Sequence, residues 1–123
     1  MQGNTNQFVI HLHQLADSRH WDLMLLKGEV LQTYRLDKPL EDIVAGEKGV
    51  AEKIGDHNIK FLDYEGLVNK GTATVKLAHK GSYSVTKQRQ DDFELRLLGK
   101  ELDVKLLFNQ TGENLWGVES VSD

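Results

Sequence analysis

The sequence predicts a mostly β protein, a small single-domain antiparallel β-barrel with little or no helix. Short stretches alternate between apolar and polar residues, as in Phe8 to His13 and Phe93 to Leu98. Glycine is frequent, with 11 in 123 residues, and turn signals separate the stretches. No heptad or helix-length apolar periodicity is present. Because many short strands separated by turns are typical of sandwiches and barrels, we expect about six to eight strands.

The elements follow from alternation and from turn residues. We expect a hairpin turn at Lys27-Gly28, a strand end at Pro39, and at most one helical turn between Leu40 and Lys48. A turn or bulge is expected at 56–58 and a hairpin turn at Lys80-Gly81. The predicted strands are 8–13, 20–26, 30–36, 50–54, 59–64, 72–79, 83–87, 93–98, 102–108 and 115–121, with a polar loop over 109–114.

Length and composition restrict the protein class. Residues 8–123 provide one domain with one modest core, after a tail over 1–7 that we expect to be flexible. The absence of cysteine excludes disulfides and thiolate metal sites. No apolar run approaches the roughly 20 residues of a membrane span. The polar start is neither a secretion signal nor a transit peptide, so we expect a cytoplasmic protein without a membrane partner.

The charge distribution has two possible interpretations. A formal net charge of −4 argues against a protein that binds nucleic acid regardless of sequence. Between Gly66 and Gln90, however, the chain has basic residues and no acidic one, namely Lys70, Lys76, Lys80, Lys87 and Arg89. This window is either a local basic face or a solvated, lysine-rich hairpin.

The stretch from His11 to Leu25 concentrates groups that bind metals. In a strand, residues i and i+2 share a face, so His11 lies on the same face as His13, and His20 on the same face as Asp22. Two neighbouring strands would bring two or three imidazoles and one carboxylate together. Such a set suits Zn²⁺, Mn²⁺ or Fe²⁺. The alternative is three unrelated surface histidines, since H-x-H and H-x-D are short patterns.

The chain also resembles a known family over nearly its whole length. The residues of this resemblance are, in order, FVIHLHQLADSRHWDLMLLKGEVLQTYRL, GEKGVAEKIGDHNIKFLDYEG, GTATVKLAHKGSY, FELRLLGKEL and NLWGV. Together they resemble the 3′-phosphoesterase domain of bacterial end-joining ligases (DNA ligase D) and its stand-alone relatives. The resemblance implies a small β-barrel that binds Mn²⁺, or Zn²⁺ or another divalent cation. It further implies removal of a 3′ phosphate or 3′ ribonucleoside in DNA repair, at a nucleic-acid 3′ end and with ligase or polymerase partner proteins.

The resemblance also assigns residues. His20 and Asp22 match two of the family's three metal ligands. The third matches His13 if this chain has one extra residue before His20, and Gln14 otherwise. His57 matches a histidine that acts near the phosphate, and is our candidate catalytic residue.

Several positions depart from the family pattern. Met24 and Gly49 stand where the family has arginines, Phe61 where it has a tyrosine, and His11 where it has a glutamine. Lost arginines remove bidentate phosphate contacts, and we consider Arg19, Arg35 and Lys48 as replacements. His11 is an extra ligand, a residue that orients a ligand, or an exposed strand residue. We therefore expect a weakened metal-dependent phosphoesterase; the alternative is a module without catalysis that binds metal, phosphate or a partner.

Overall fold

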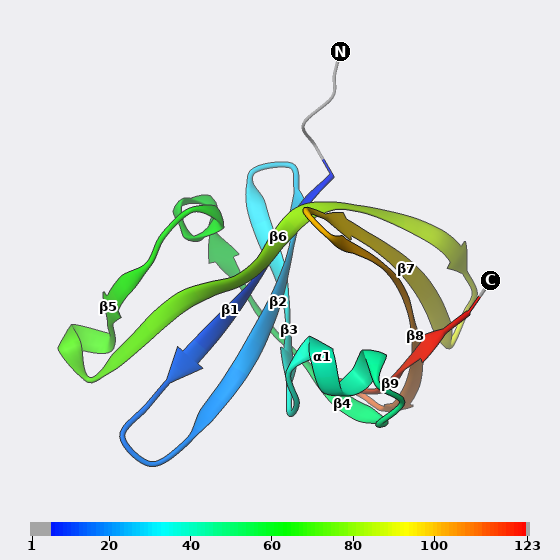
Figure 1. Ribbon diagram of the computed structural model, residues 1–123, viewed down its shortest axis with the longest axis horizontal. Coiled ribbons are helices and arrows are strands. Elements are labelled where there is room, and N and C mark those ends of the chain that lie inside the picture. The colour runs from blue at the N-terminus through cyan, green and yellow to red at the C-terminus, as the bar shows by residue number, and fades with distance from the viewer. Residues whose placement is uncertain (1–5, 123) are drawn as a thin grey trace.

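In the computed structural model, which describes residues 6–122, one antiparallel sheet of nine strands closes into a barrel-like ring (Figure 1). The sheet order is β1-β2-β3-β4-β9-β8-β7-β6-β5, and pairing of β1 with β6 closes the ring and leaves β5 at its edge. This confirms the predicted fold class, although the sheet has nine strands where six to eight were expected. The strands are β1 (Gln7–Gln14), β2 (Arg19–Lys27), β3 (Val30–Leu36), β4 (Gly49–Asn58), β5 (Gly66–Val68), β6 (Ala73–Gln88), β7 (Asp92–Gly99), β8 (Leu102–Gly112) and β9 (Leu115–Val121).

Helical structure in the described residues is limited to single turns. The helix α1 (Leu40–Val44) begins after Pro39, as predicted, and buries Leu40 and Ile43. The 3₁₀ turns are η1 (Ile59–Leu62) and η2 (Asn69–Gly71). None of the described helices is long and apolar enough to cross a membrane. Of the predicted tail, residues 1–5 lie outside the described residues, and Gln7 already belongs to β1.

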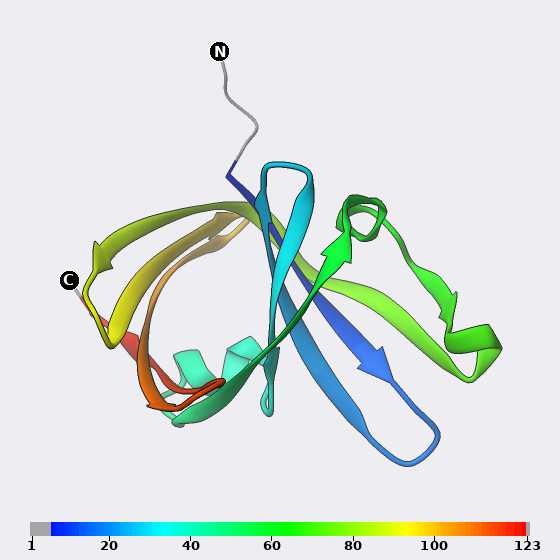
Figure 2. The same cartoon turned by 180° about the vertical axis from the view of Figure 1, so that it is seen from behind.

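The predicted hairpin at Lys80-Gly81 is wrong, because β6 is one continuous strand of 16 residues. Its first half pairs with β1 and its second half with β7, and the exchange occurs at Gly81. A β-carbon at Gly81 would overlap the Leu98 carbonyl oxygen. This glycine therefore permits a close backbone approach within a strand rather than a turn. The long curved path of β6 is visible from behind in Figure 2.

Two other segments have a different secondary structure from the one predicted. Residues 59–64 do not form a strand, because the Asn58 side chain accepts a hydrogen bond from the Lys60 amide at 2.9 Å and starts η1 instead. The expected loop over 109–114 is mostly strand, since β8 continues to Gly112 opposite Leu115.

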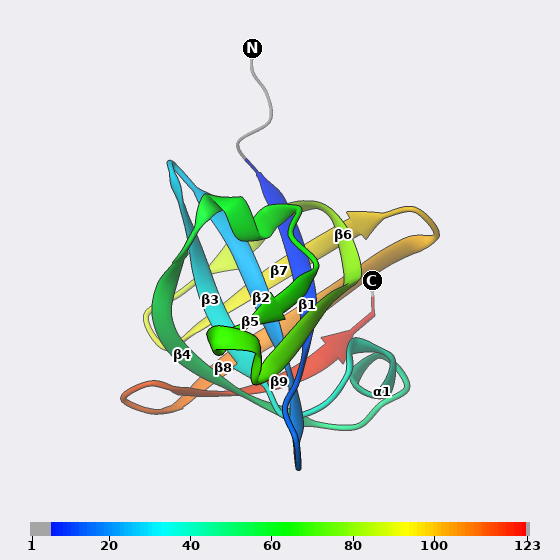
Figure 3. The same ribbon diagram turned by 90° about the vertical axis from the view of Figure 1, so that its left-hand side faces the viewer.

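Apolar side chains pack on both faces of the β1–β2–β3 sheet. The barrel interior holds the larger cluster, which includes Phe8, Leu23, Leu36 and Phe108. On the outer face a smaller cluster forms from Val9, Met24, Leu26, Leu31 and Leu62, with Phe61 and Leu77 packed against it. The segment from the end of β4 through β5 and the first half of β6 covers this outer face (Figure 3). The candidate functional residues lie on this covered outer face.

Candidate metal centre and adjoining cavity

Strand register brings the candidate ligands onto one face. In the β1–β2 ladder, His13 is opposite His20 and His11 is opposite Asp22. In the β2–β3 ladder, Asp22 is opposite Arg35. The alternate residues Leu23 and Leu25 of β2 point into the barrel interior, as the period of two predicts.

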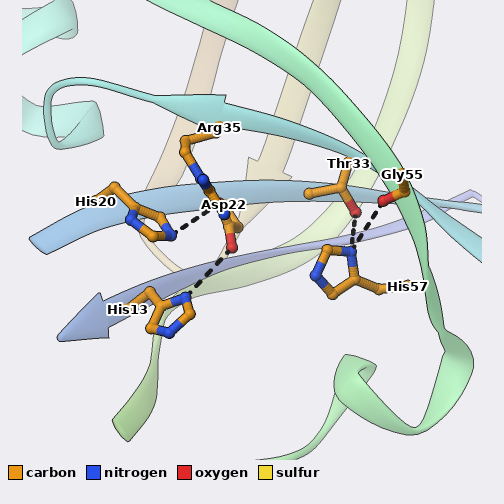
Figure 4. Close-up of polar contacts among 7 residues, drawn as sticks. All are labelled: His13, His20, Asp22, Thr33, Arg35, Gly55 and His57. Atoms are coloured by element: carbon orange, nitrogen blue, oxygen red, sulfur yellow. Dashed lines mark hydrogen bonds and ion pairs between the residues drawn. The ribbon is translucent and has the colours of Figure 1, made fainter. Parts of the chain in front are cut away.

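His13, His20 and Asp22 meet at a single point (Figure 4). One ligand atom from each residue lies within 4.8 Å of the others. Asp22 is 2% exposed; its Oδ2 is 3.9 Å from His13 Nδ1 and its Oδ1 is 3.5 Å from His20 Nε2. Arg35 Nε lies 3.5 Å from the same Oδ1. A buried carboxylate thus has two imidazoles and one guanidinium around it.

The protonation and bonding of this cluster suit a divalent metal. The buried Nε2 atoms of His13 and His20 have no hydrogen-bond partner. Burial lowers the pKa of His20, and the charges of Arg35 and His13 lower it further against the opposing effect of Asp22. A neutral imidazole is the form that binds metals. Two imidazoles and a carboxylate, with unused nitrogens, therefore fit a cation of the Mn²⁺ or Zn²⁺ class.

The structure distinguishes between the two candidates for the first ligand position. Gln14 is exposed, and its amide nitrogen donates to the carbonyls of Leu15 at 3.0 Å and Ser18 at 3.2 Å. It thereby closes the β1–β2 loop. His13, with its ring centroid 4.5 Å from that of His20, is the residue that lies with the other two.

His57 reaches the same face because β4 contains a bulge. Leu31 pairs with His57 and Thr33 with Ile54, so β4 has one residue more than β3 in this interval. Without that residue, Asp56 would lie opposite Leu31 and His57 would turn to the other face. The bulge between Ile54 and His57, which overlaps the turn or bulge predicted at 56–58, thus determines which side chain faces the site.

Hydrogen bonds also set the tautomer of His57. Its Nδ1 is 2.9 Å from Thr33 Oγ1 and 3.2 Å from the Gly55 carbonyl oxygen. The Thr33 hydroxyl donates to the Leu31 carbonyl, and a carbonyl only accepts, so Nδ1 carries the proton and donates. The other ring nitrogen is left for chemistry, and Figure 4 shows it turned towards the side where His13 and Asp22 lie.

A small cavity adjoins the metal-ligand cluster. Its volume is about 140 Å³, and its lining is His11, His13, Asp22, Met24, His57, Phe61, Val68, Asn69 and Val75. The rings of His11 and His57 each contact Phe61 edge-on, at centroid distances of 6.4 Å and 6.0 Å. The cavity therefore joins the cluster to His57.

A comparison with protein families identifies the family of this chain. The family model of the DNA Ligase D 3′-phosphoesterase domain matches residues 11–110, which include every candidate site residue named above. The chain belongs to the DNA ligase D 3′-phosphoesterase domain family. A comparison with curated proteins gave no match.

Within this family, the departures of the chain can now be located in the structure. Met24 and Phe61 both line the cavity, so the side chains that replace an arginine and a tyrosine of the family pattern are at the site itself. Gly49 is different, since a β-carbon there would face Ile43 and Asp37, at 3.0 Å and 3.3 Å. Neither residue belongs to the cavity lining.

Of the three cations considered as replacements, one lies at the site. Arg35 contacts Asp22. Arg19 is instead exposed, with its guanidinium carbon 5.6 Å from the Trp21 ring centroid. The Lys48 side chain is 83% exposed and lies 3.8 Å from Glu119. Arg19 and Lys48 are thus exposed side chains in this structure, and a contact of either one with the phosphate stays a prediction.

Sequence reasoning missed Thr33, which fixes the His57 ring, and Asn69, which lines the cavity. Thr33 shares a face with Arg35 by the same period of two, so alternation could have identified it. Asn69 lies in a 3₁₀ turn with positive φ and gives no such signal.

The basic window from Gly66 to Gln90 is partly neutralised. Lys80 pairs with Asp63 at 2.7 Å and Arg89 with Asp92 at 2.6 Å. Lys76, Lys80 and Lys87 lie along the continuous strand β6 rather than on the predicted hairpin, and Lys70 lies in η2.

Proposed function

We propose that this protein is a divalent-metal-dependent 3′-phosphoesterase that acts on nucleic-acid 3′ ends in DNA repair and removes a 3′ phosphate or ribonucleoside. One observation carries the proposal. Ligand atoms of His13, His20 and Asp22 lie within 4.8 Å of one another. The resemblance assigns His20 and Asp22 to the metal, with His13 as one of two candidates for the third ligand. Ligase or polymerase proteins are the partners that such a role would require.

Each residue has a chemical role in this proposal. His13, His20 and Asp22 would hold the cation, which supplies Lewis acidity at the phosphorus centre. Arg35 contacts Asp22 and offers guanidinium donors beside the cluster. His57 is held at Nδ1 by Thr33 and Gly55, and its other nitrogen faces the site. When the ring is protonated, this nitrogen can donate to a phosphoryl oxygen or give its proton to the leaving oxygen.

The replaced side chains support a lower rate than in relatives that keep the family's arginines. Loss of one pre-organised donor typically costs about 100- to 1,000-fold in rate. Met24 and Phe61 provide none where the family has an arginine and a tyrosine. The same observation favours the second candidate, a module without catalysis that binds metal or phosphate.

A primer-template assay tests the proposal. The native chain and His20→Ala are incubated with a 3′-phosphate primer and with a 3′-ribonucleoside primer, with Mn²⁺ and with EDTA. We expect slow, Mn²⁺-dependent formation of a 3′ hydroxyl that His20→Ala abolishes. Metal binding by calorimetry without turnover on either primer would support the module without catalysis instead.

A further inference from the structure

His11 is the least satisfied polar side chain in the described core. Its exposure is 0%, and neither Nδ1 nor Nε2 has a partner within hydrogen-bond geometry, although the Phe61 backbone lies close enough to act on its pKa. An unpaired buried polar group typically costs about 1–3 kcal/mol. A residue of this kind in a native protein calls for an explanation, and a bound ligand is one.

The surroundings of His11 indicate what that ligand is. His11 lines the cavity of about 140 Å³ together with His57, and both rings contact Phe61 edge-on. That volume equals roughly four or five water molecules at about 30 Å³ each. The space accommodates a small polar group such as a phosphate, and a nucleoside attached to it would have to lie outside.

His11 is not placed as a ligand of the same cation. The group whose ligand atoms lie within 4.8 Å of one another comprises His13, His20 and Asp22 without it. The Asp22 oxygens face His13, His20 and Arg35. The His11 ring thus remains available to donate into the cavity.

We propose that His11 and His57 form a phosphate-binding pair beside the metal centre, in which the His11 N–H donates to a phosphoryl oxygen. The pair supplies a donor on the side where Met24 and Phe61 provide none. The ligand class is a phosphate group carried as a monoester or as free inorganic phosphate. This inference rests on the proposed function, and what it adds to the phosphate position of that site is one residue of this chain, His11.

Inorganic phosphate binding in the presence of Mn²⁺ tests the pair without requiring turnover. Calorimetry measures Mn²⁺ affinity first and phosphate affinity second for the native chain, His11→Leu, His11→Gln and His79→Leu. His79 is the matched control, because it is the one histidine of five outside the site and pairs with Glu41 at 3.3 Å. We expect His11→Leu to weaken phosphate binding about tenfold or more, in line with a lost charge-assisted hydrogen bond. His11→Gln, which keeps an N–H donor, should retain most of the affinity.

Unchanged phosphate affinity in His11→Leu overturns the inference, and so does a parallel loss of Mn²⁺ affinity, which would make His11 a metal ligand. Thermal unfolding provides a readout that separates binding from folding. Leucine removes two unpaired nitrogens next to Phe61 and Leu77, so Tm should rise while phosphate affinity falls. A fall in both would assign His11 a purely structural role. Phosphate binding that depends on His11 without turnover on the primers would leave this inference intact and refute the phosphoesterase activity.

Discussion

Met24 is 2% exposed and lines the cavity with His57, two residues along β2 from Asp22. An arginine there would bring a guanidinium to the cavity that is proposed to hold the phosphate. We expect Met24→Arg to raise metal-dependent turnover of a 3′-phosphate primer about 10- to 100-fold. This gain is smaller than the rate effect of a donor that is already pre-organised in the site. It should also lower the free energy of unfolding by about 1–3 kcal/mol, because a charge is buried in an apolar cluster.

Gly49→Arg is the control for that experiment, because its side chain would start towards Ile43 rather than towards the cavity. We expect no gain in turnover from it. If Met24→Arg also gives no gain, while the native chain is already fast, then Arg35 and His11 supply enough positive charge or donors on their own.

The buried histidines predict an acid-sensitive metal-free protein. Burial lowers the pKa of His11 and His20 from their ordinary value of 6.5. Below about pH 6.5 the unfolded chain therefore binds more protons than the folded one, and stability falls as the pH decreases. Urea denaturation in EDTA at pH 7.5, 6.5 and 5.5 should show a falling midpoint, with a shallower fall in His11→Leu. A flat profile would mean that both rings bind protons equally in the folded and unfolded chain.

At the scale of the elements, closure of the ring depends on one residue of β6. Gly81 lies where β6 leaves β1 and begins to pair with β7, against the Leu98 carbonyl. We expect Gly81→Ala to destabilise the protein by at least about 2 kcal/mol, since a backbone atom has to move. Gly55→Ala is the matched control, because a β-carbon at this other strand glycine would have no atom within 4 Å. Similar urea midpoints for the two variants would contradict this account of ring closure.

The same element marks where sequence reasoning fails. Glycine indicates a turn and a close backbone approach equally well, so Lys80-Gly81 was read as a hairpin although β6 continues. The β2–β3 hairpin was predictable, because alternation and a two-residue turn fix its register, which also places Arg35 opposite Asp22. No predicted strand register relates Arg19 or Lys48 to Asp22, so the sequence does not determine whether they lie at the site. The ends of β1 and β2 meet through a loop whose geometry the sequence does not determine, so His13 and Gln14 stayed unresolved until the structure placed them.

For the whole molecule, the β1–β2–β3 sheet separates two environments. Its interior face builds the larger apolar cluster, and its outer face carries the candidate ligands and the cavity. Because alternate residues serve the two faces, substitutions at the ligands leave the interior packing in place. Variants such as His20→Ala should therefore remain folded, and metal binding becomes measurable as added stability.

The effect of metal on thermal stability tests directly whether the ligands on the outer face of this sheet bind an ion. A ligand that binds only the folded chain at 100 times its Kd adds about 2.7 kcal/mol. For a domain of this size that corresponds to roughly 10 °C in Tm. We expect Mn²⁺ or Zn²⁺ to raise the Tm of the native chain by this order, EDTA to reverse the rise, and His20→Ala to abolish it. His79→Ala should respond like the native chain, because His79 lies outside the cluster. A Tm independent of both metals up to millimolar concentration would show that these three side chains meet without binding an ion, and the phosphoesterase proposal would lose the observation on which it depends.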